Sequence, residues 1–513
     1  MTKILTTTLV GLLITSMVLS SSGWAIGPTL PADDTKTPIK HVVVIFQENI
    51  SYDHYFGTYP NAAGFTTKPN TPSSNNYISH PTLLTANPNL VAPFLLPTSK
   101  AITCDFDHGY LDEQKAYDGG LVDKFVQDLG KTGTNCNPDG STVMGYYDGS
   151  TVTGLWTIAQ NFAMSDNSFD TEFGPSTPGA LDLVSGQTFG ATEDAVGGGA
   201  AISDADPTYD DCHSGTTIAM SGKNIGDLLN EKGITWGWFQ GGFAPTATTG
   251  GKAVCGATTH RTATDNAVVA AYSAHHEPFE YYNSTSNPHH LPPASLAEIG
   301  NNGQANHQYD LSLFYASVKN GNMPAVTFLK APRSQDGHPG NSDPLDEQVF
   351  LANVTNTLQK SPYWSSTAEI ILYDDSDGWY DHVMPQIVNH SNDPLNDFAP
   401  TCGGKHAELG GADDRCGHGP RQPLLVVSPY AKSNFISHTE SDQSSVLKFI
   451  EDNWHTGSIP NTLGQKSFDD KAGSLEDMFD FDNHGNTPQV CIDPTTGQVD
   501  PFASCPIVDL NGY

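Results

Sequence analysis

Two short groups of oxygen-bearing side chains each follow an apolar segment of the chain, and together they could bind a metal ion. The apolar, β-branched segments are residues 41–46 (HVVVIF) and 369–373 (EIILY). Carboxylate and amide oxygens suit hard cations such as Ca²⁺, Mg²⁺ and Mn²⁺. Carboxylates brought together repel one another unless a cation lies between them. The pattern predicts one divalent metal ion, with Zn²⁺ as a further alternative. The predicted ligands are Glu48, Asn49, Asp374 and Asp375.

Each of these two groups also has an ordinary structural interpretation. Asn49 could cap a following helix, and Asp374 and Asp375 could shape the turn that leads to Gly378. For one such group alone, the structural interpretation is the better one. We favour metal binding because two such groups follow two buried-type strands in the same chain.

A candidate nucleophile, Ser176, lies in the segment FGPSTPG at residues 173–179. We expect it at or just before a helix over residues 178–185, with Thr177 as the N-cap. Backbone N–H groups and the helix dipole stabilise an anion at such a position, whether an alkoxide or a bound phosphate. The alternative is that Ser176 and Thr177 only cap the helix. The segment differs from the G-x-S-x-G turn of α/β hydrolases, which argues against a Ser-His-Asp triad.

Histidines could supply the remaining chemistry, and the chain contains 19 of them. A cluster of histidines that exchanges protons near neutral pH can bind phosphate oxygens and protonate a leaving group. A single histidine in a loop is more often only a solvated or hydrogen-bonded side chain. The candidates in polar segments are His108, His275, His276, His289, His290, His338 and His382.

The elements that must position these residues alternate between strands and helices. Unalternating apolar runs are typical of strands buried in a parallel sheet, and strands that alternate with helices favour an α/β sandwich. Ligands of such sheets bind at the carboxyl ends of the strands, where both oxygen-bearing groups would lie. The predicted strands are 42–46, 233–239, 324–329, 369–373 and 423–428. The predicted helices are 110–129, 178–185, 348–359 and one that begins at 444.

The chain is strongly acidic, with 23 basic and 57 acidic residues and a formal charge of −34. This charge argues against nonspecific nucleic-acid binding, which needs a basic surface. An anionic substrate would have to meet local positive charge, from a metal ion or from protonated histidine.

The N-terminus and the cysteines predict an exported protein. Residues 1–25 read as a secretory signal peptide, with a basic start and an apolar centre, and no later segment predicts a transmembrane helix. The eight cysteines all follow that segment. In an oxidising compartment they would form disulfides, and pairing in sequence order would give Cys402–Cys416 and Cys491–Cys505 as short loops. Free buried thiols are the alternative. We expect a secreted or periplasmic protein.

Five segments, in order along the chain, resemble the bacterial phosphoesterase family of secreted acid phosphatases and phosphatidylcholine-specific phospholipases C. The resemblance implies a three-layer α/β sandwich with a mostly parallel central sheet, similar to the alkaline phosphatase superfamily. It also implies a single domain over residues 26–513, with a core at 38–455 and a C-terminal wrap at 456–513. The matching segments are residues 40–60, 173–188, 335–340 (QDGHPG), 373–383 (YDDSDGWYDHV) and 417–432 (GHGPRQPLLVVSPYAK).

The same resemblance assigns roles to individual residues. The family's metal ligands fall on Glu48, Asn49, Asp374 and Asp375, and its nucleophile falls on Ser176, which also contacts the metal. Its phosphate-binding histidines fall on His108, His275, His276 and His338, where spacing alone favours His275 and His276 over His289 and His290. The segment at 176–179 (STPG) is closer to the acid phosphatase branch, and Ile50 stands where the family usually has arginine.

The resemblance leads to a functional expectation with two alternatives. We expect a secreted phosphomonoesterase in which the metal and Asn49 hold the phosphate and Ser176 attacks phosphorus to form a phosphoserine. The histidines would neutralise phosphate oxygens, and one would protonate the leaving group. A phospholipase C that cleaves lipid phosphodiesters would use the same site. A non-catalytic, metal-stabilised binding protein would need neither Ser176 nor the histidines.

Overall fold

The computed structural model describes residues 34–62, 64–192, 199–403, 409, 412–460 and 467–508. The predicted signal peptide lies outside these residues. Within the described ranges, no helix combines the length and the apolar character that crossing a membrane requires.

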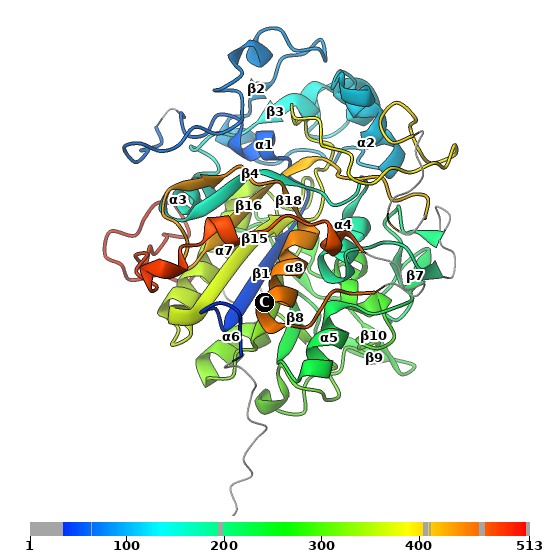
Figure 1. Cartoon of the computed structure of the whole chain (residues 1–513), viewed down its shortest axis with the longest axis vertical. Helices are drawn as coiled ribbons and strands as arrows, with labels where there is room; N and C mark the ends of the chain where they lie inside the picture. Colours follow the sequence, from blue (N-terminus) through cyan, green and yellow to red (C-terminus); the bar gives the residue numbers. More distant parts are fainter. Residues whose placement is uncertain are drawn as a thin grey trace, which may run out of the picture.

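A mixed sheet of nine strands forms the centre of the fold, and it confirms the predicted α/β class (Figure 1). Each strand predicted from the sequence is present in this sheet, with ends shifted by up to three residues. In sheet order the strands are β13 (Gln308–Asp310), β8 (Trp236–Gln240), β14 (Val326–Lys330), β1 (His41–Gln47), β15 (Thr367–Tyr373), β16 (Arg421–Val427), β4 (Ala163–Phe169) and β17 (Phe435–Ser437), with β18 (Ser441–Asp442) also paired to β4.

All neighbouring strands of this sheet run parallel except at β16, which is antiparallel to both β15 and β4. The expectation of a mostly parallel sheet is therefore confirmed. Strand β1 lies between β14 and β15, and its register pairs Gln47 with Tyr373. The polar residues that follow these two strands consequently leave the sheet side by side.

Helices pack on the sheet and on one another. Thr355 of α7 donates a hydrogen bond to Glu369 of β15, and the Tyr373 hydroxyl of β15 donates to Glu347 of α7. Helix α4 packs against α8 and α5. The helices are α1 (Tyr52–Phe56), α2 (Tyr110–Tyr117), α3 (Thr153–Asn161), α4 (Ser176–Ser185), α5 (Ile225–Lys232), α6 (Ser312–Asn320), α7 (Pro344–Lys360) and α8 (Gln443–Trp454).

Two helix predictions are wrong in detail. The helix expected over residues 110–129 ends at Tyr117, because Asp118 adopts a left-handed conformation (φ 42°), and a separate π-helical turn covers Phe125–Leu129. Helix α4 begins at Ser176 with Pro175 as its N-cap, so Thr177 is not the cap. Ser176 is therefore the first residue of the helix.

Short strands form small sheets outside the central one. In Figure 1, the segments coloured light blue to cyan gather near α1, beyond the end of β1. The short strands are β2 (Phe94–Leu95), β3 (Gly145–Tyr146), β5 (Ala191–Thr192), β6 (Asp206–Pro207), β7 (Thr217–Met220), β9 (Ala247–Thr249), β10 (Lys252–Val254), β11 (Thr258–His260) and β12 (Val268–Ala270).

Four disulfides pair the cysteines in sequence order, and none of the eight is free. The pairs are Cys104–Cys136, Cys212–Cys255, Cys402–Cys416 and Cys491–Cys505. Disulfide formation is therefore confirmed over free thiols. The last pair lies in the C-terminal segment, which α7 holds through Asn356 Nδ2 donating to the Ile492 carbonyl at 2.6 Å.

Candidate active site

The carboxyl ends of β1 and β15 bring the two predicted metal-binding groups together. The Asp374 N–H donates to the Gln47 carbonyl at 3.1 Å, which continues the ladder by one residue. The Asn49 N–H then donates to Asp374 Oδ1 at 2.8 Å. Asn49 adopts a left-handed conformation (φ 59°), which asparagine tolerates better than most residues. Two segments more than three hundred residues apart thus share one hydrogen-bonded turn.

Ser176 lies against these carboxylates. Its hydroxyl donates to Asp375 Oδ2 at 2.9 Å and lies 3.3 Å from Glu48 Oε2. The approach is close because Gly179 of α4 faces the Asp374 carbonyl, where an added Cβ would lie only 2.0 Å from the oxygen. The structure therefore places the predicted nucleophile at the helix start and within the predicted metal cluster.

Burial and mutual repulsion disfavour the ionised forms of the carboxyl groups in this cluster when no cation is bound. Burial, followed by the charge of Glu48, raises the pKa of Asp374 to about 7. Burial and the Asp374 charge raise the pKa of Asp375 well above its usual value. Among the described residues, nothing donates a hydrogen bond to Asn49 Oδ1 or Asp374 Oδ2, although both atoms are buried. A divalent cation would satisfy these oxygens and restore the ionised state, so the residues fit the predicted metal.

Lys330 and Asp336 also belong to this cluster, and the sequence reasoning missed both. Lys330 ends β14 and its ammonium contacts Glu48 Oε1, with an exposed fraction of only 1%. The Asp336 carbonyl accepts the Glu48 N–H at 2.8 Å. Burial raises the pKa of Asp336 to about 7, against the lowering effect of Lys330. The available signal was a lysine at the end of a predicted buried strand that neighbours β1.

His276 and His275 approach the cluster from a 3-10 turn at Ala274–His276. His276 Nδ1 lies 3.0 Å from Glu48 Oε1, and the two histidine rings contact each other with centroids 4.4 Å apart. Burial, together with the charge of His275, lowers the pKa of His276 well below its usual value. His275 is partly exposed; burial lowers its pKa, but its hydrogen bond to Asp206 and the charges of Asp204, Glu48 and Asp206 together outweigh burial and raise it. Asp206 Oδ1 lies 3.4 Å from His275 Nδ1.

His108 and His338 complete the predicted histidine set. His108 Nδ1 lies 3.0 Å from the Phe106 carbonyl and 3.6 Å from Asp377 Oδ1. The His338 N–H donates to Asp336 Oδ1 at 3.0 Å. Burial lowers the pKa of His338, and the charge of His108 acts in the same direction. The charge of His108 thus affects the pKa of His338, and the charges of His338 and His275 affect the pKa of His276, so these four histidines lie in one region of the molecule.

The alternative histidines lie elsewhere. His290 Nε2 lies 2.9 Å from Asp210 Oδ1, and its ring stacks on Phe243. His289 is exposed and pairs with Asp211 at 2.7 Å. His382 pairs with Asp53 at 2.6 Å, within a buried network that also contains Arg421. The structure thus brings His275 and His276, and none of these three, to the carboxylates.

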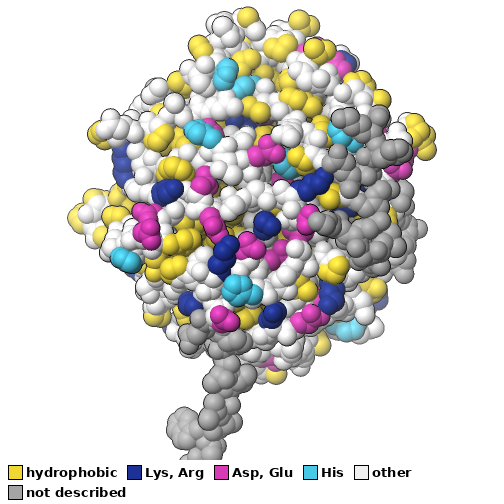
Figure 2. Space-filling view, viewed as in Figure 1, with side chains coloured by type: hydrophobic (Ala, Val, Ile, Leu, Met, Phe, Trp, Pro, Cys, Tyr) yellow, Lys and Arg dark blue, Asp and Glu magenta, His cyan; other side chains and the backbone are white. Residues whose placement is uncertain are grey.

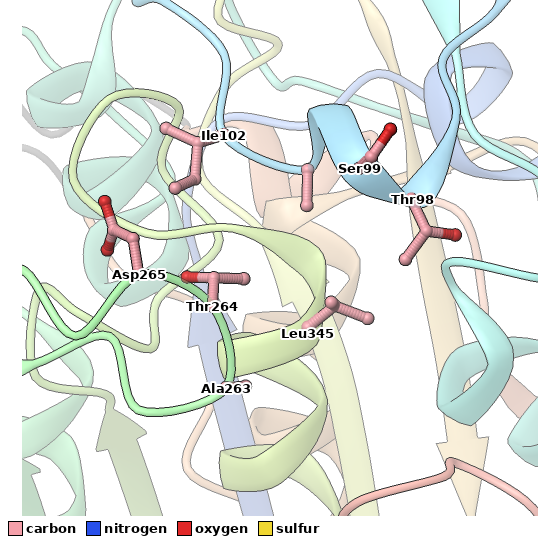
Figure 3. A pocket seen from close by; sticks show the side chains of 8 residues that line it. Thr98, Ser99, Ile102, Ala263, Thr264, Asp265 and Leu345 are labelled. Carbon is pink, nitrogen blue, oxygen red and sulfur yellow. The ribbon is translucent and has the colours of Figure 1, made fainter.

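A separate pocket of about 340 Å³ lies outside the carboxylate cluster (Figure 3). Its lining residues are Thr98, Ser99, Ala101, Ile102, Ala263, Thr264, Asp265 and Leu345 of α7. None of these lining residues is a predicted site residue.

The surface charge is mixed on the face drawn in Figure 2, where acidic and basic side chains are interspersed.

Comparison with known proteins relates most of the chain to one family. The profile of the Phosphoesterase family matches residues 39–457. A non-hemolytic phospholipase C of Burkholderia pseudomallei is 26% identical over 90% of this chain and 62% of its own length. One of Pseudomonas aeruginosa is 24% identical over 91% and 61%. Phospholipase C B of Mycobacterium tuberculosis is 24% identical over 88% and 79%. The chain spans about three fifths of the first two relatives.

Two solved structures are similar to this chain at lower sequence identity. A protein in the alkaline phosphatase superfamily from Vibrio parahaemolyticus covers 86% of this chain and 74% of its own, with 10% identity and a TM-score of 0.34. Murine ectonucleotide pyrophosphatase/phosphodiesterase 5 covers 64% of this chain and 94% of its own, with 13% identity and a TM-score of 0.30.

Proposed function

The chain belongs to the Phosphoesterase family, and we propose that it is a metal-dependent hydrolase that prefers phosphate monoesters. The observation that carries this proposal is the position of Ser176. Ser176 is the first residue of helix α4, and its hydroxyl donates to Asp375 Oδ2 at 2.9 Å, beside Glu48. A hydroxyl at a helix start, among carboxylates suited to a cation, is placed for nucleophilic attack on a phosphate.

The metal ion would be held by Glu48, Asn49, Asp374 and Asp375, whose oxygens suit Mg²⁺, Ca²⁺ or Mn²⁺. When bound, the ion would neutralise phosphate charge and favour ionisation of a nearby hydroxyl. Asn49 would orient the substrate phosphate beside it.

The residues of the chain carry the two steps of hydrolysis. Ser176 Oγ attacks phosphorus as its proton passes to Asp375, the carboxylate that already accepts its hydrogen bond. The bond between phosphorus and the ester oxygen breaks, and a histidine of the set donates a proton to the leaving alkoxide. His275 is suited to this role because its pKa is raised. Water then attacks phosphorus and gives a proton to the histidine that has lost one. The bond between phosphorus and Ser176 Oγ breaks, Asp375 returns its proton to Ser176, and phosphate is released.

Replacement of the nucleophile tests this proposal. We expect Ser176→Ala to reduce turnover of p-nitrophenyl phosphate by a factor of about 10³ or more, since the covalent route is lost. We expect a chelator to abolish wild-type activity and an added divalent ion to restore it. Ser474→Ala, a change at an exposed serine in the C-terminal segment, is the matched control. Undiminished turnover by Ser176→Ala would refute the mechanism.

The names of the relatives favour a second candidate, a phospholipase C that acts on lipid phosphodiesters. The same purified protein decides between them when it is also given phosphatidylcholine vesicles. Faster release of phosphocholine than hydrolysis of p-nitrophenyl phosphate would favour the phospholipase. Retention of metal without turnover of either ester would favour a binding protein.

We also propose that the protein is exported. Four disulfides and the absence of a membrane-spanning helix in the described ranges support a secreted or periplasmic protein.

A further inference from the structure

Arg333 differs from the other arginines of this acidic chain in having no carboxylate partner in the part of the chain that the structure describes. The chain has four arginines. Arg261 pairs with Asp265 at 2.7 Å, Arg415 with Glu172 at 3.2 Å, and Arg421 with Asp53 and Asp381 at 3.1 Å each. Among the described residues, no ion pair to Arg333 is present.

The Arg333 side chain is also incompletely satisfied within the protein. Its Nε is buried and finds no hydrogen-bond partner among the described residues. A buried donor without a partner is unfavourable, and more so when it is charged. With 57 acidic residues in the chain, the lack of a carboxylate partner within the described ranges indicates that this guanidinium is available to bind another anion.

The position of Arg333 relates it to the candidate active site. It lies in the turn between Lys330, which contacts Glu48, and Asp336, whose carbonyl accepts the Glu48 N–H. Its own N–H donates to the Ala271 carbonyl at 3.1 Å, which ties the turn to the segment that leads to His276. Its charge is one of those that lower the pKa values of His276 and Asp336. Arg333 therefore lies on the histidine side of the carboxylate cluster.

We propose that Arg333 binds an oxygen of the substrate phosphate and makes the site prefer monoester dianions over diester monoanions. The proposal rests on the phosphoesterase function proposed above. A monoester carries one more negative charge and one more free oxygen than a diester, and a guanidinium fork can bind two phosphate oxygens at once. Lys330 cannot serve in its place, because its ammonium is held by Glu48.

The test compares one monoester with one diester in two variants. We expect Arg333→Gln to lower kcat/KM for p-nitrophenyl phosphate by roughly tenfold to hundredfold, the effect of losing one or two charge-assisted hydrogen bonds. We expect kcat/KM for bis-p-nitrophenyl phosphate to change far less, so the ratio between the substrates falls. Arg333→Lys should retain part of the preference. Lys319→Gln, an equal charge change at an exposed residue of α6, should leave the ratio unchanged.

A second measurement does not depend on turnover. The affinity of the metal-loaded protein for inorganic phosphate, measured by titration calorimetry, should fall in Arg333→Gln by about the same factor as the monoester kcat/KM. An unchanged substrate ratio together with unchanged phosphate affinity would overturn the role of Arg333. If the wild-type protein hydrolysed neither ester, the proposed function would fail, and the phosphate titration would still decide whether Arg333 binds phosphate. Arg333→Lys provides the comparison if Arg333→Gln does not fold.

Discussion

Lys330 shows how a single residue outside the recognised motifs completes a site. Its ammonium is buried against Glu48, stacks over the Phe46 ring at 4.8 Å and lies near Asp336. A buried carboxylate cluster needs compensating positive charge, and here a fixed lysine supplies part of it. A divalent cation would supply the rest. The Lys330 ammonium and the bound cation would therefore together keep Glu48 ionised in the interior.

Replacing Lys330 tests this division of charge. We expect Lys330→Met, studied with a chelator, to lose about 3 kcal/mol of stability, because it leaves Glu48 buried without its partner. An added divalent ion should raise the melting temperature of Lys330→Met more than that of the wild type. Lys330→Arg, which keeps the charge, is the control. An unchanged melting temperature in chelator would show that Lys330 does not compensate Glu48. The measurement is thermal unfolding, so it does not depend on activity.

At the scale of elements, the contact between strand β15 and helix α7 contains a buried acid away from the site. Glu369 of β15 is fully buried and accepts a hydrogen bond from Thr355 of α7 at 2.6 Å. Burial raises its pKa to about 8, and the Thr355 hydrogen bond only partly opposes this. The sheet therefore holds Glu369 in its protonated form, and ionisation would place an uncompensated charge under the helix.

This acid predicts a pH dependence of stability. Because the folded pKa is raised, the native state binds the proton more tightly than the unfolded state between about pH 4.5 and pH 8, so stability falls as pH rises through that window. We expect Glu369→Gln to remove up to roughly 4 kcal/mol of this decline. Urea unfolding at pH 5 and pH 8 measures it, with Glu231→Gln on the surface as the control. Parallel pH profiles for wild type and Glu369→Gln would contradict the assignment.

At the scale of the whole molecule, disulfides of equal loop length anchor two different regions. Cys402–Cys416 and Cys491–Cys505 each separate their cysteines by 14 residues. The Cys416 carbonyl accepts the Phe173 N–H at 2.9 Å, next to the turn that presents Ser176. The Cys491–Cys505 loop instead packs against the last turns of α7. The two disulfides close loops of equal length, but only Cys402–Cys416 lies next to the candidate active site.

Removing each pair separates stability from activity. We expect the double variants Cys402→Ala/Cys416→Ala and Cys491→Ala/Cys505→Ala each to lose about 3 kcal/mol of unfolding free energy, as loops of this length predict. Only the first should also lower kcat/KM for p-nitrophenyl phosphate. Equal loss of activity in both variants would show that the C-terminal segment supports the site as well. Urea unfolding and initial rates under identical metal concentrations provide the comparison.

Patterns that are local in the sequence were sufficient to predict much of this fold. Apolar runs identified β1, β8, β14, β15 and β16 of the central sheet, and polar residues directly after two of them identified Glu48, Asn49, Asp374 and Asp375 as neighbours. The prediction succeeded because strand ends in a parallel sheet meet at one edge. It failed at residues 110–129, where Asp118 adopts a left-handed conformation that amphipathic spacing does not reveal.

Contacts between distant segments decided the rest, because no local pattern encodes which strands pair. The antiparallel direction of β16, the approach of Lys330 to Glu48 and the position of Arg333 all follow from the order of strands in the sheet. The same holds for the histidines. His275 and His276 resemble His289 and His290 as sequence, but only the chain's path beside β8 and β14 brings the first pair to the carboxylates. Residue types and strand ends are properties of the sequence, whereas the partners that each charge meets are properties of the tertiary structure.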